Sequence, residues 1–140
     1  MHDLTYLSLG AGVQSSALYI MSVLGIHGCP RADFAIFADT QSEPQWVYDQ
    51  LEKLKAWGGD VIPVVTVSKG SLEVDALKKQ GSRAGSRFVC IPSFTMGPDG
   101  RATILRRQCT REYKIDPIEK HVRKVLGYEP RQRIKKKAAA

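Results

Sequence analysis

The sequence predicts an α/β domain in which a parallel sheet is sandwiched by helices, with a β-hairpin insertion and a C-terminal helix. Apolar runs at 4–9, 33–39 and 61–67 alternate with segments of helical periodicity at 15–26 and 45–58. Such alternation favours parallel strands joined by right-handed crossovers. The middle run reads DFAIFAD. Because it lacks a strict alternation of apolar and polar residues, we expect a central strand that is covered on both faces.

The composition of the chain is typical of a single domain in a reducing compartment. Its 140 residues, of which 43% are apolar, are enough for one core. We expect the domain at 1–128 and a basic tail without fixed structure at 129–140. The three cysteines form no CxxC pair, which argues against a disulfide framework. The sequence has no apolar run of about 18 residues and no signal-peptide pattern, so it predicts a cytoplasmic protein without a membrane partner.

Positive charge is concentrated in the second half of the chain. The formal net charge is +7, although acids outnumber bases up to Asp60. The excess of bases begins near Arg101 and ends in the run at 131–137. A charge of this size and distribution predicts a polyanionic partner, which is a nucleotide, a nucleic acid or both.

The first helix, at 15–26, has apolar residues on nearly every side, so we expect it to be buried against one face of the sheet. The second helix, at 45–58, is amphipathic, with apolar side chains at helical spacing: Val47, Leu51, Leu54 and Trp57. In the third strand, at 61–67, Pro63 requires a position near the start or at an edge. A short helix at 71–80 follows, with Ser71 as its N-cap.

The last third of the chain predicts a hairpin and one more helix. The segments 87–94 and 101–106 flank a turn at 97–100, Gly-Pro-Asp-Gly, which indicates a β-hairpin. The final helix spans 110–126, and Pro117 must lie in its first turn. Its apolar residues form one stripe: Ile115, Ile118, Val122, Val125 and Leu126.

The turn at 10–16, Gly-Ala-Gly-Val-Gln-Ser-Ser, joins the first strand to the first helix and predicts a site for an anion. The first N–H groups of a helix lack intrahelical partners and carry partial positive charge, so phosphate commonly binds there. A Walker loop, GxxxxGKS/T, is excluded because no lysine is present. A dinucleotide fingerprint, GxGxxG, fits Gly10 and Gly12 but finds Ser15 at the third glycine. A tight turn without any ligand is the remaining alternative.

Three stretches in chain order share a further pattern. Residues 10–15 read Gly-Ala-Gly-Val-Gln-Ser, residues 37–40 read Phe-Ala-Asp-Thr and are followed by Glu43 and Pro44, and residues 109–118 read CTREYKIDPI. Together they resemble the phosphoadenosine phosphosulfate (PAPS) reductase-like family of the ATP pyrophosphatase, or adenine nucleotide alpha hydrolase-like, superfamily. The first stretch aligns without a gap to the pyrophosphate loop Ser-Gly-Gly-x-Asp-Ser, the second resembles the stretch after the second strand, and the third resembles the segment C-C-x-x-x-K-x-x-P-apolar.

The resemblance implies a Rossmann-like domain that binds ATP or PAPS, with Mg²⁺ at Asp39. The implied chemistry is adenylyl or sulfur transfer at the α-phosphate with release of pyrophosphate. The implied catalytic residues are Lys114 and Cys109. The implied cofactor-binding residues are Ser8, Gly10, Ala11, Gly12, Gln14, Ser15, Ser16, Asp39, Thr40, Arg107 and Arg111.

Departures from the family pattern limit what it implies. Thr110 replaces the second cysteine of the pair, and an iron–sulfur cluster is not expected because a cubane cluster generally needs four thiolates. No cysteine follows Cys109, so the chain alone is not expected to reduce a sulfonucleotide. Gln14 replaces the aspartate of the loop. Members of the family continue past the C-terminal helix, so the resemblance implies a shortened member.

Several alternatives stay open from the sequence. The chain could be a non-catalytic nucleic-acid-binding protein that retains the fold, a fragment of a sulfonucleotide reductase, or a dinucleotide-binding module. Asp39 could be a cap of its loop, and Lys114 a solvated helix lysine. Cys109 could be a small buried apolar residue, an active thiol next to arginines, or the remnant of a cluster site.

Overall fold

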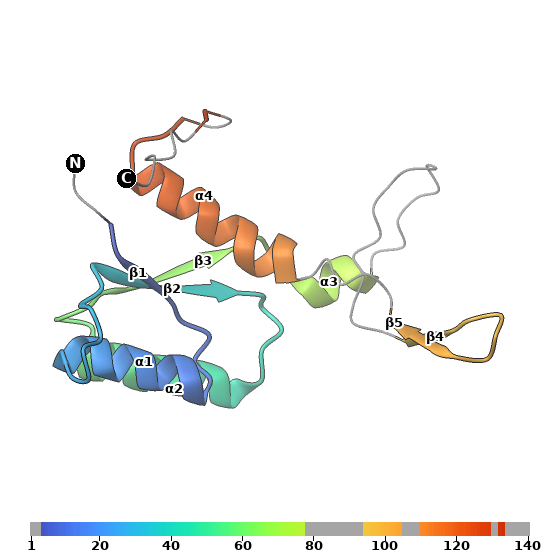
Figure 1. Ribbon diagram of the computed structural model, residues 1–140, viewed down its shortest axis with the longest axis horizontal. Helices are drawn as coiled ribbons and strands as arrows, with labels where there is room; N and C mark the ends of the chain where they lie inside the picture. Colours follow the sequence, from blue (N-terminus) through green and yellow to red (C-terminus); the bar gives the residue numbers. More distant parts are fainter. Residues whose placement is uncertain (1–3, 78–93, 105–109, 130–131, 134–140) are drawn as a thin grey trace.

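The computed structural model describes residues 4–77, 94–104, 110–129 and 132–133 (Figure 1). The elements in chain order are β1 (Tyr6–Ser8), α1 (Val13–Leu24), β2 (Phe34–Asp39), α2 (Gln45–Gly58), β3 (Val64–Ser68), α3 (Leu72–Leu77), β4 (Phe94–Met96), β5 (Ala102–Ile104), the π-helix η1 (Thr110–Ile115) and α4 (Asp116–Val125). Strands and helices alternate up to α3, as predicted. No helix in these ranges has the length and apolar character needed to cross a membrane.

The described part of the main sheet is small, open and parallel, with strand order β1-β2-β3. Tyr6 lies opposite Phe34, and Ile36 lies opposite Val65. The first five residues of β2 are buried and the last is half-buried. The prediction of a central strand covered on both faces is therefore confirmed, and the arrangement is compatible with a Rossmann-like fold.

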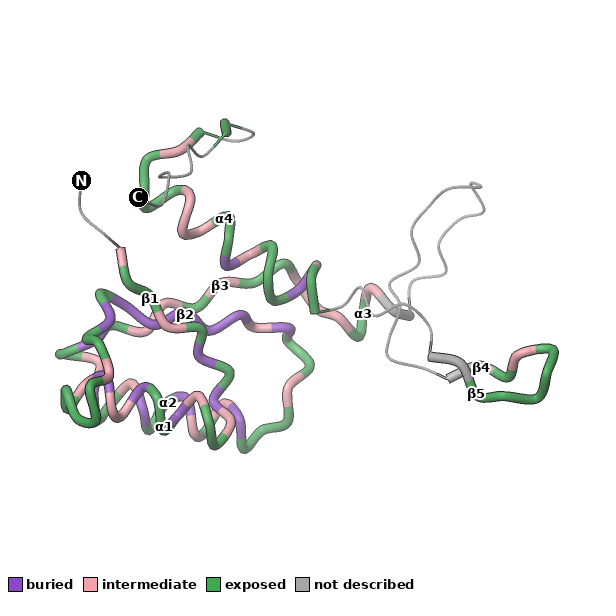
Figure 2. The backbone as a smooth tube through the Cα atoms, in the orientation of Figure 1, coloured by how far each residue is buried: buried purple, intermediate pink, exposed green. Residues whose placement is uncertain are grey.

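Helices α1 and α2 cover one face of this sheet. Side chains of the sheet and of α2 meet in one core cluster, which contains Leu9, Ala35, Phe37, Val47, Leu51 and Leu54. Figure 1 shows both helices on the same side of the strands, and Figure 2 shows the buried residues concentrated along β2 and in these helices. Two successive crossovers that step in the same direction across a parallel sheet are expected to share one face, because both have the same hand.

Helix α4 covers the opposite face. Phe34, Ile36 and Ala38 of β2 pack there against Ile118, with Val122 beside them. Pro117 lies in the first turn of α4, as predicted. The sheet is thus sandwiched between helical layers (Figure 1).

The predicted hairpin is present as the separate antiparallel pair β4 and β5, with Met96 opposite Ala102. The Gly97 N–H donates to the Arg101 carbonyl at 2.9 Å and closes the turn. The rest of the predicted hairpin, at 87–93 and 105–106, lies outside the described residues. So does most of the predicted tail.

The first helix lies against one face of the sheet, as predicted, but it is buried along one stripe only, although apolar residues occur on nearly every side. Its buried residues are Ser16, Tyr19 and Ser22, whereas Leu18 is 46% and Leu24 54% exposed. A helix that lies on a sheet buries one stripe, and small serines allow the close approach on that stripe. The outer face stays open within the described part of the chain. Trp57 of α2 is likewise exposed, contrary to its predicted place on the buried stripe.

Several predicted boundaries are shifted by a few residues. Helix α1 begins at Val13, not at residue 15, because Gly12 takes an extended conformation and serves as the N-cap. It ends at Gly25, which has a φ of +64°. Strand β3 begins after Pro63. Ser71 caps α3 as predicted, since its Oγ accepts a hydrogen bond from the Val74 N–H at 3.2 Å. The first six residues of the predicted last helix form the π-helix η1.

Tyr19 joins α1 to the segment that enters β3. The residue is fully buried, and its hydroxyl donates to the Ile62 carbonyl at 2.7 Å. Burial raises the pKa of Tyr19 above its ordinary value. This phenol therefore stays neutral and acts as a donor that ties one covering helix to the sheet.

Replacing Tyr19 by Phe is expected to lower the free energy of unfolding by about 1–2 kcal/mol, because the buried Ile62 carbonyl loses its donor. Urea unfolding followed by circular dichroism measures the change. Tyr6→Phe is the matched control, since Tyr6 is 40% exposed, and it should change stability by less than about 0.5 kcal/mol. Equal losses in the two variants would contradict this role of Tyr19.

Candidate functional site

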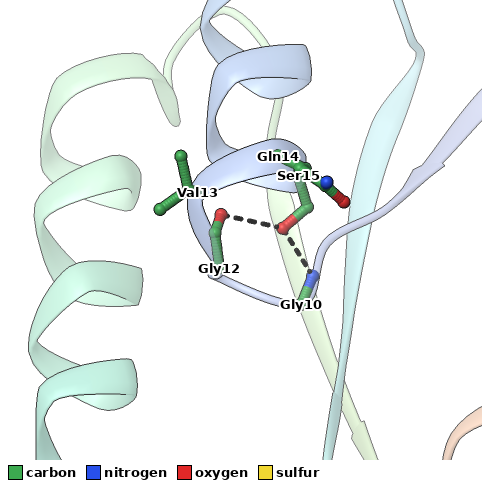
Figure 3. Close-up of a pocket in the computed structure, with 5 residues that line it drawn as sticks. All are labelled: Gly10, Gly12, Val13, Gln14 and Ser15. Atoms are coloured by element: carbon green, nitrogen blue, oxygen red, sulfur yellow. Dashed lines mark hydrogen bonds between the residues drawn. The ribbon is translucent and has the colours of Figure 1, made fainter.

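The turn between β1 and α1 is fixed by its own serine. The Ser15 Oγ accepts a hydrogen bond from the Gly10 N–H at 3.2 Å and donates to the Gly12 carbonyl, also at 3.2 Å (Figure 3). Ala11 is buried and has a φ of +54°, a conformation that side-chain-bearing residues rarely adopt. The surrounding structure must hold this strained position, and strain of this kind is concentrated at functional sites.

An open pocket of about 400 Å³ lies at this turn and is lined by Gly10, Gly12, Val13, Gln14 and Ser15. Figure 3 shows Val13 and Gln14 on opposite sides of the first helical turn, with Gly12 and Gly10 below them. Four of these five residues belong to the predicted cofactor site. Val13 does not. Its apolar side chain gave no signal in the sequence, and it is 89% exposed.

The other predicted residues of the turn lie differently. Ser8, at the end of β1, is exposed, whereas Ala11 and Ser16 are buried. The Ser16 Oγ has no hydrogen-bond partner among the described residues. A buried hydroxyl without a partner is uncommon in folded proteins. The turn therefore combines strained backbone, open space and an unmet polar group.

The Asp39 carboxylate ends β2 and is engaged by its own loop. Its Oδ1 accepts hydrogen bonds from the Gln41 N–H at 2.7 Å and from the Tyr48 hydroxyl at 2.8 Å. Burial, and then the hydrogen bond to Asp39, raise the pKa of Tyr48, so this phenol remains a donor. The structure thus shows Asp39 in the loop-capping arrangement that the sequence left open. Its role toward Mg²⁺ or a ribose stays a prediction.

Thr40, Glu43 and Lys114 come together beside this loop. The hydroxyl of the buried Thr40 donates to Glu43 Oε1 at 3.2 Å, and Lys114 Nζ lies 2.9 Å from the same oxygen. Two segments that carry the family resemblance, at 39–44 and 109–118, therefore meet in space. Glu43 was not among the predicted site residues, although its place in the Asp-Thr…Glu-Pro stretch could have indicated it.

The π-helix η1 is held on the sheet by a second group of contacts. Lys69, which follows β3, lies 2.9 Å from Glu112 Oε2, and its Nζ is 4.7 Å from the centre of the Tyr113 ring. The buried Tyr113 donates its hydroxyl to Asp75 Oδ2 at 2.6 Å. π-Helical turns are rare and frequently occur at functional sites. Nothing in the sequence distinguished these four side chains.

The side chains at the carboxyl end of the sheet could hold Mg²⁺ only together with the phosphates of a bound ligand. No group of three or more His, Cys, Asp or Glu side chains in the described ranges could hold a metal ion. Mg²⁺ is commonly held by one or two carboxylates together with substrate phosphates and water, and Asp39 could supply one of these carboxylates.

Of the remaining predicted site residues, Arg111 is exposed, with its Nε 3.6 Å from Asp116 Oδ1. Cys109 and Arg107 lie outside the described residues.

These pieces lie at one end of the sheet. The strands are parallel, so the turn after β1, the loop after β2 and Lys69 after β3 all follow carboxyl ends (Figure 1). In open α/β sheets ligands bind in the crevice outside these ends. The arrangement can therefore hold an anionic ligand at the turn, with polar groups of the neighbouring loop beside it.

Comparisons of the chain with protein-family models, with curated proteins and with solved structures found no match.

Stability at high pH tests the environment of Tyr113. Burial, and then the hydrogen bond to Asp75, raise the pKa of Tyr113 from 10.0 to about 12. Because the folded state holds this proton more tightly than the unfolded state, the resulting stabilisation is complete below pH 10 and is lost between pH 10 and 12. In Tyr113→Phe, the free energy of unfolding should fall less steeply over this interval than in the wild type.

Urea unfolding at a series of pH values measures the slopes. Tyr6→Phe removes a half-exposed tyrosine and should follow the wild-type curve. If all three proteins lost stability equally between pH 10 and 12, Tyr113 would not be the titrating group.

Proposed function

We propose that this protein binds an adenine nucleotide, ATP or PAPS, at the carboxyl end of its parallel sheet. The single observation that carries the proposal is the strained, glycine-lined turn of residues 10–16, which opens a pocket at the start of α1. The first N–H groups of that helix have no intrahelical partners, and the helix dipole favours a negative charge beside them. The triphosphate, or the phosphosulfate, would lie in this pocket.

The three stretches at 10–15, 37–44 and 109–118 support assigning the fold and the chemistry to the PAPS reductase-like branch of the adenine nucleotide alpha hydrolase-like superfamily. Adenylyl or sulfur transfer at the α-phosphate, with release of pyrophosphate, is the reaction that this assignment implies. Asp39 and Thr40 would lie next to the ribose or to Mg²⁺. Backbone N–H groups and cationic side chains would stabilise the charge that develops at the phosphorus.

Lys114 pairs with Glu43, so a bound phosphate would share or replace this partner. The side chain of Lys114 is 47% exposed, and ion pairs at such positions contribute about 0–1 kcal/mol. Exchanging Glu43 for a phosphate oxygen would therefore cost Lys114 little. The position of Lys114, held but not buried, suits a residue that exchanges one anionic partner for another.

Calorimetric titration with ATP, PAPS and NAD tests the proposal. ATP or PAPS should release heat, and Gly12→Ala should weaken binding by at least about tenfold, which is 1.4 kcal/mol. A Cβ on Gly12 meets no atom within 4 Å, so this variant adds a methyl group to the pocket lining without disturbing the fold. Lys114→Gln should also weaken binding. Lys53→Gln removes one exposed positive charge from α2 and serves as the matched control.

Absence of heat with both ATP and PAPS would overturn the proposal. Binding of NAD alone would favour a dinucleotide module instead. ATP binding that is unchanged in Gly12→Ala would place the site elsewhere on the protein.

A further inference from the structure

Four basic residues lie between the middle of α4 and the segment that follows this helix, and we call them the α4 basic cluster: Lys120, Arg123, Lys124 and Arg133. Lys120 and Lys124 are exposed, and α4 keeps its apolar residues Ile118 and Val122 against the sheet. The cluster begins in the middle of α4 and continues past its C-terminal end, whereas η1 and the candidate site lie at the N-terminal end of this helix (Figure 1). It is therefore a surface separate from the proposed nucleotide site.

A chain reversal after α4 builds this cluster. Gly127 has a φ of +75°, and the Tyr128 N–H returns to the Arg123 carbonyl at 2.9 Å. The Arg123 guanidinium donates to the Gln132 carbonyl and lies 6.0 Å from the centre of the Tyr128 ring. These contacts thus hold the segment that carries Arg133 beside the end of α4.

The cluster has no anionic partner within the described part of the chain, where none of its four side chains forms an ion pair with a carboxylate. By contrast, Lys69, Arg111 and Lys114 near the candidate site each have one. Cations in the last turn of a helix gain up to about 1 kcal/mol from the helix dipole, but that effect decays within one turn and does not reach Lys120. Neighbouring like charges repel, and an external polyanion would relieve the repulsion.

We propose that the α4 basic cluster binds the phosphodiester backbone of a nucleic acid. Its outward face carries cations at a spacing of three to four residues, and side chains at that spacing lie on the same face of a helix. Further bases follow in the sequence at Lys135, Lys136 and Lys137. An anionic membrane is the less favoured partner, because Ile118 and Val122 pack on the sheet and leave only Val125 and Leu126 as exposed large apolar side chains near the cluster, a small apolar area for entering a bilayer.

Fluorescence anisotropy with a labelled single-stranded RNA and a labelled DNA duplex tests this inference. Affinity should fall steeply between about 50 and 200 mM NaCl, because bound counterions are released from the phosphates. The triple variant Lys120→Gln, Lys124→Gln, Arg133→Gln should bind at least about tenfold more weakly. Its plot of log affinity against log salt should be shallower by about 0.7–0.9 for each phosphate contact that is lost.

A second triple variant is the matched control. Arg31→Gln, Lys53→Gln and Arg101→Gln remove the same charge from three exposed positions outside the cluster, and this protein should bind as the wild type does. If both triple variants bound nucleic acid equally weakly, the loss of affinity would follow from net charge alone, and the proposal would be overturned.

Two further outcomes would also overturn it. One is unchanged binding in the cluster variant together with complete loss in Lys135→Gln, Lys136→Gln, Lys137→Gln. The other is a cluster variant that no longer binds phosphatidylserine vesicles but still binds nucleic acid as the wild type does. Calorimetric ATP binding should be the same in the wild type and the cluster variant, so this inference and the proposed nucleotide site can fail independently.

Discussion

The burial of β2 on both faces is the constraint on which the rest of this structure depends. Phe34 and Ile36 turn toward α4, whereas Ala35 and Phe37 turn toward α1 and α2. A strand without a solvent-facing side needs a helical layer on each face, and its neighbours must be strands joined by helical crossovers. The carboxyl end of β2 then lies between the turn after β1 and Lys69 after β3. The loop that begins at Asp39 is thereby placed at the centre of the candidate site.

Burial and charge act differently in holding η1 on this edge. The ring of Tyr113 is 1% exposed, and burial of a side chain of this size contributes about 1.5–3 kcal/mol. Its hydrogen bond to Asp75 adds about 1 kcal/mol. The ion pairs of Lys69 and Lys114 are partly exposed and contribute about 0–1 kcal/mol each. The apolar anchor therefore holds the segment in place, while the charged contacts can be exchanged.

Elements with a one-sided pattern could be predicted from the sequence, and those without one could not. The stripe of Val47, Leu51 and Leu54 indicated the buried side of α2, and the pair Gly58-Gly59 indicated where this helix ends. In α1, apolar residues occur all round the helix, so the pattern could not select which side packs; the structure chose the stripe of Tyr19 and two serines. The π-helical geometry of η1 has no periodic signature. In the structure η1 contacts β2, Lys69 after β3 and Asp75 of α3.

By itself, the sequence determined the alternation of strands and helices, the glycine turn at 10–16, the cap at Ser71 and the place of Pro117, because each depends on local backbone geometry. It also located the excess of positive charge. Only the tertiary structure decided that Glu43 meets Lys114, that Asp75 meets Tyr113 and that Tyr48 engages Asp39. The first two of these pairs are 71 and 38 residues apart in the chain. Contacts between such distant residues follow from how the helical layers pack on the sheet, which no local pattern encodes.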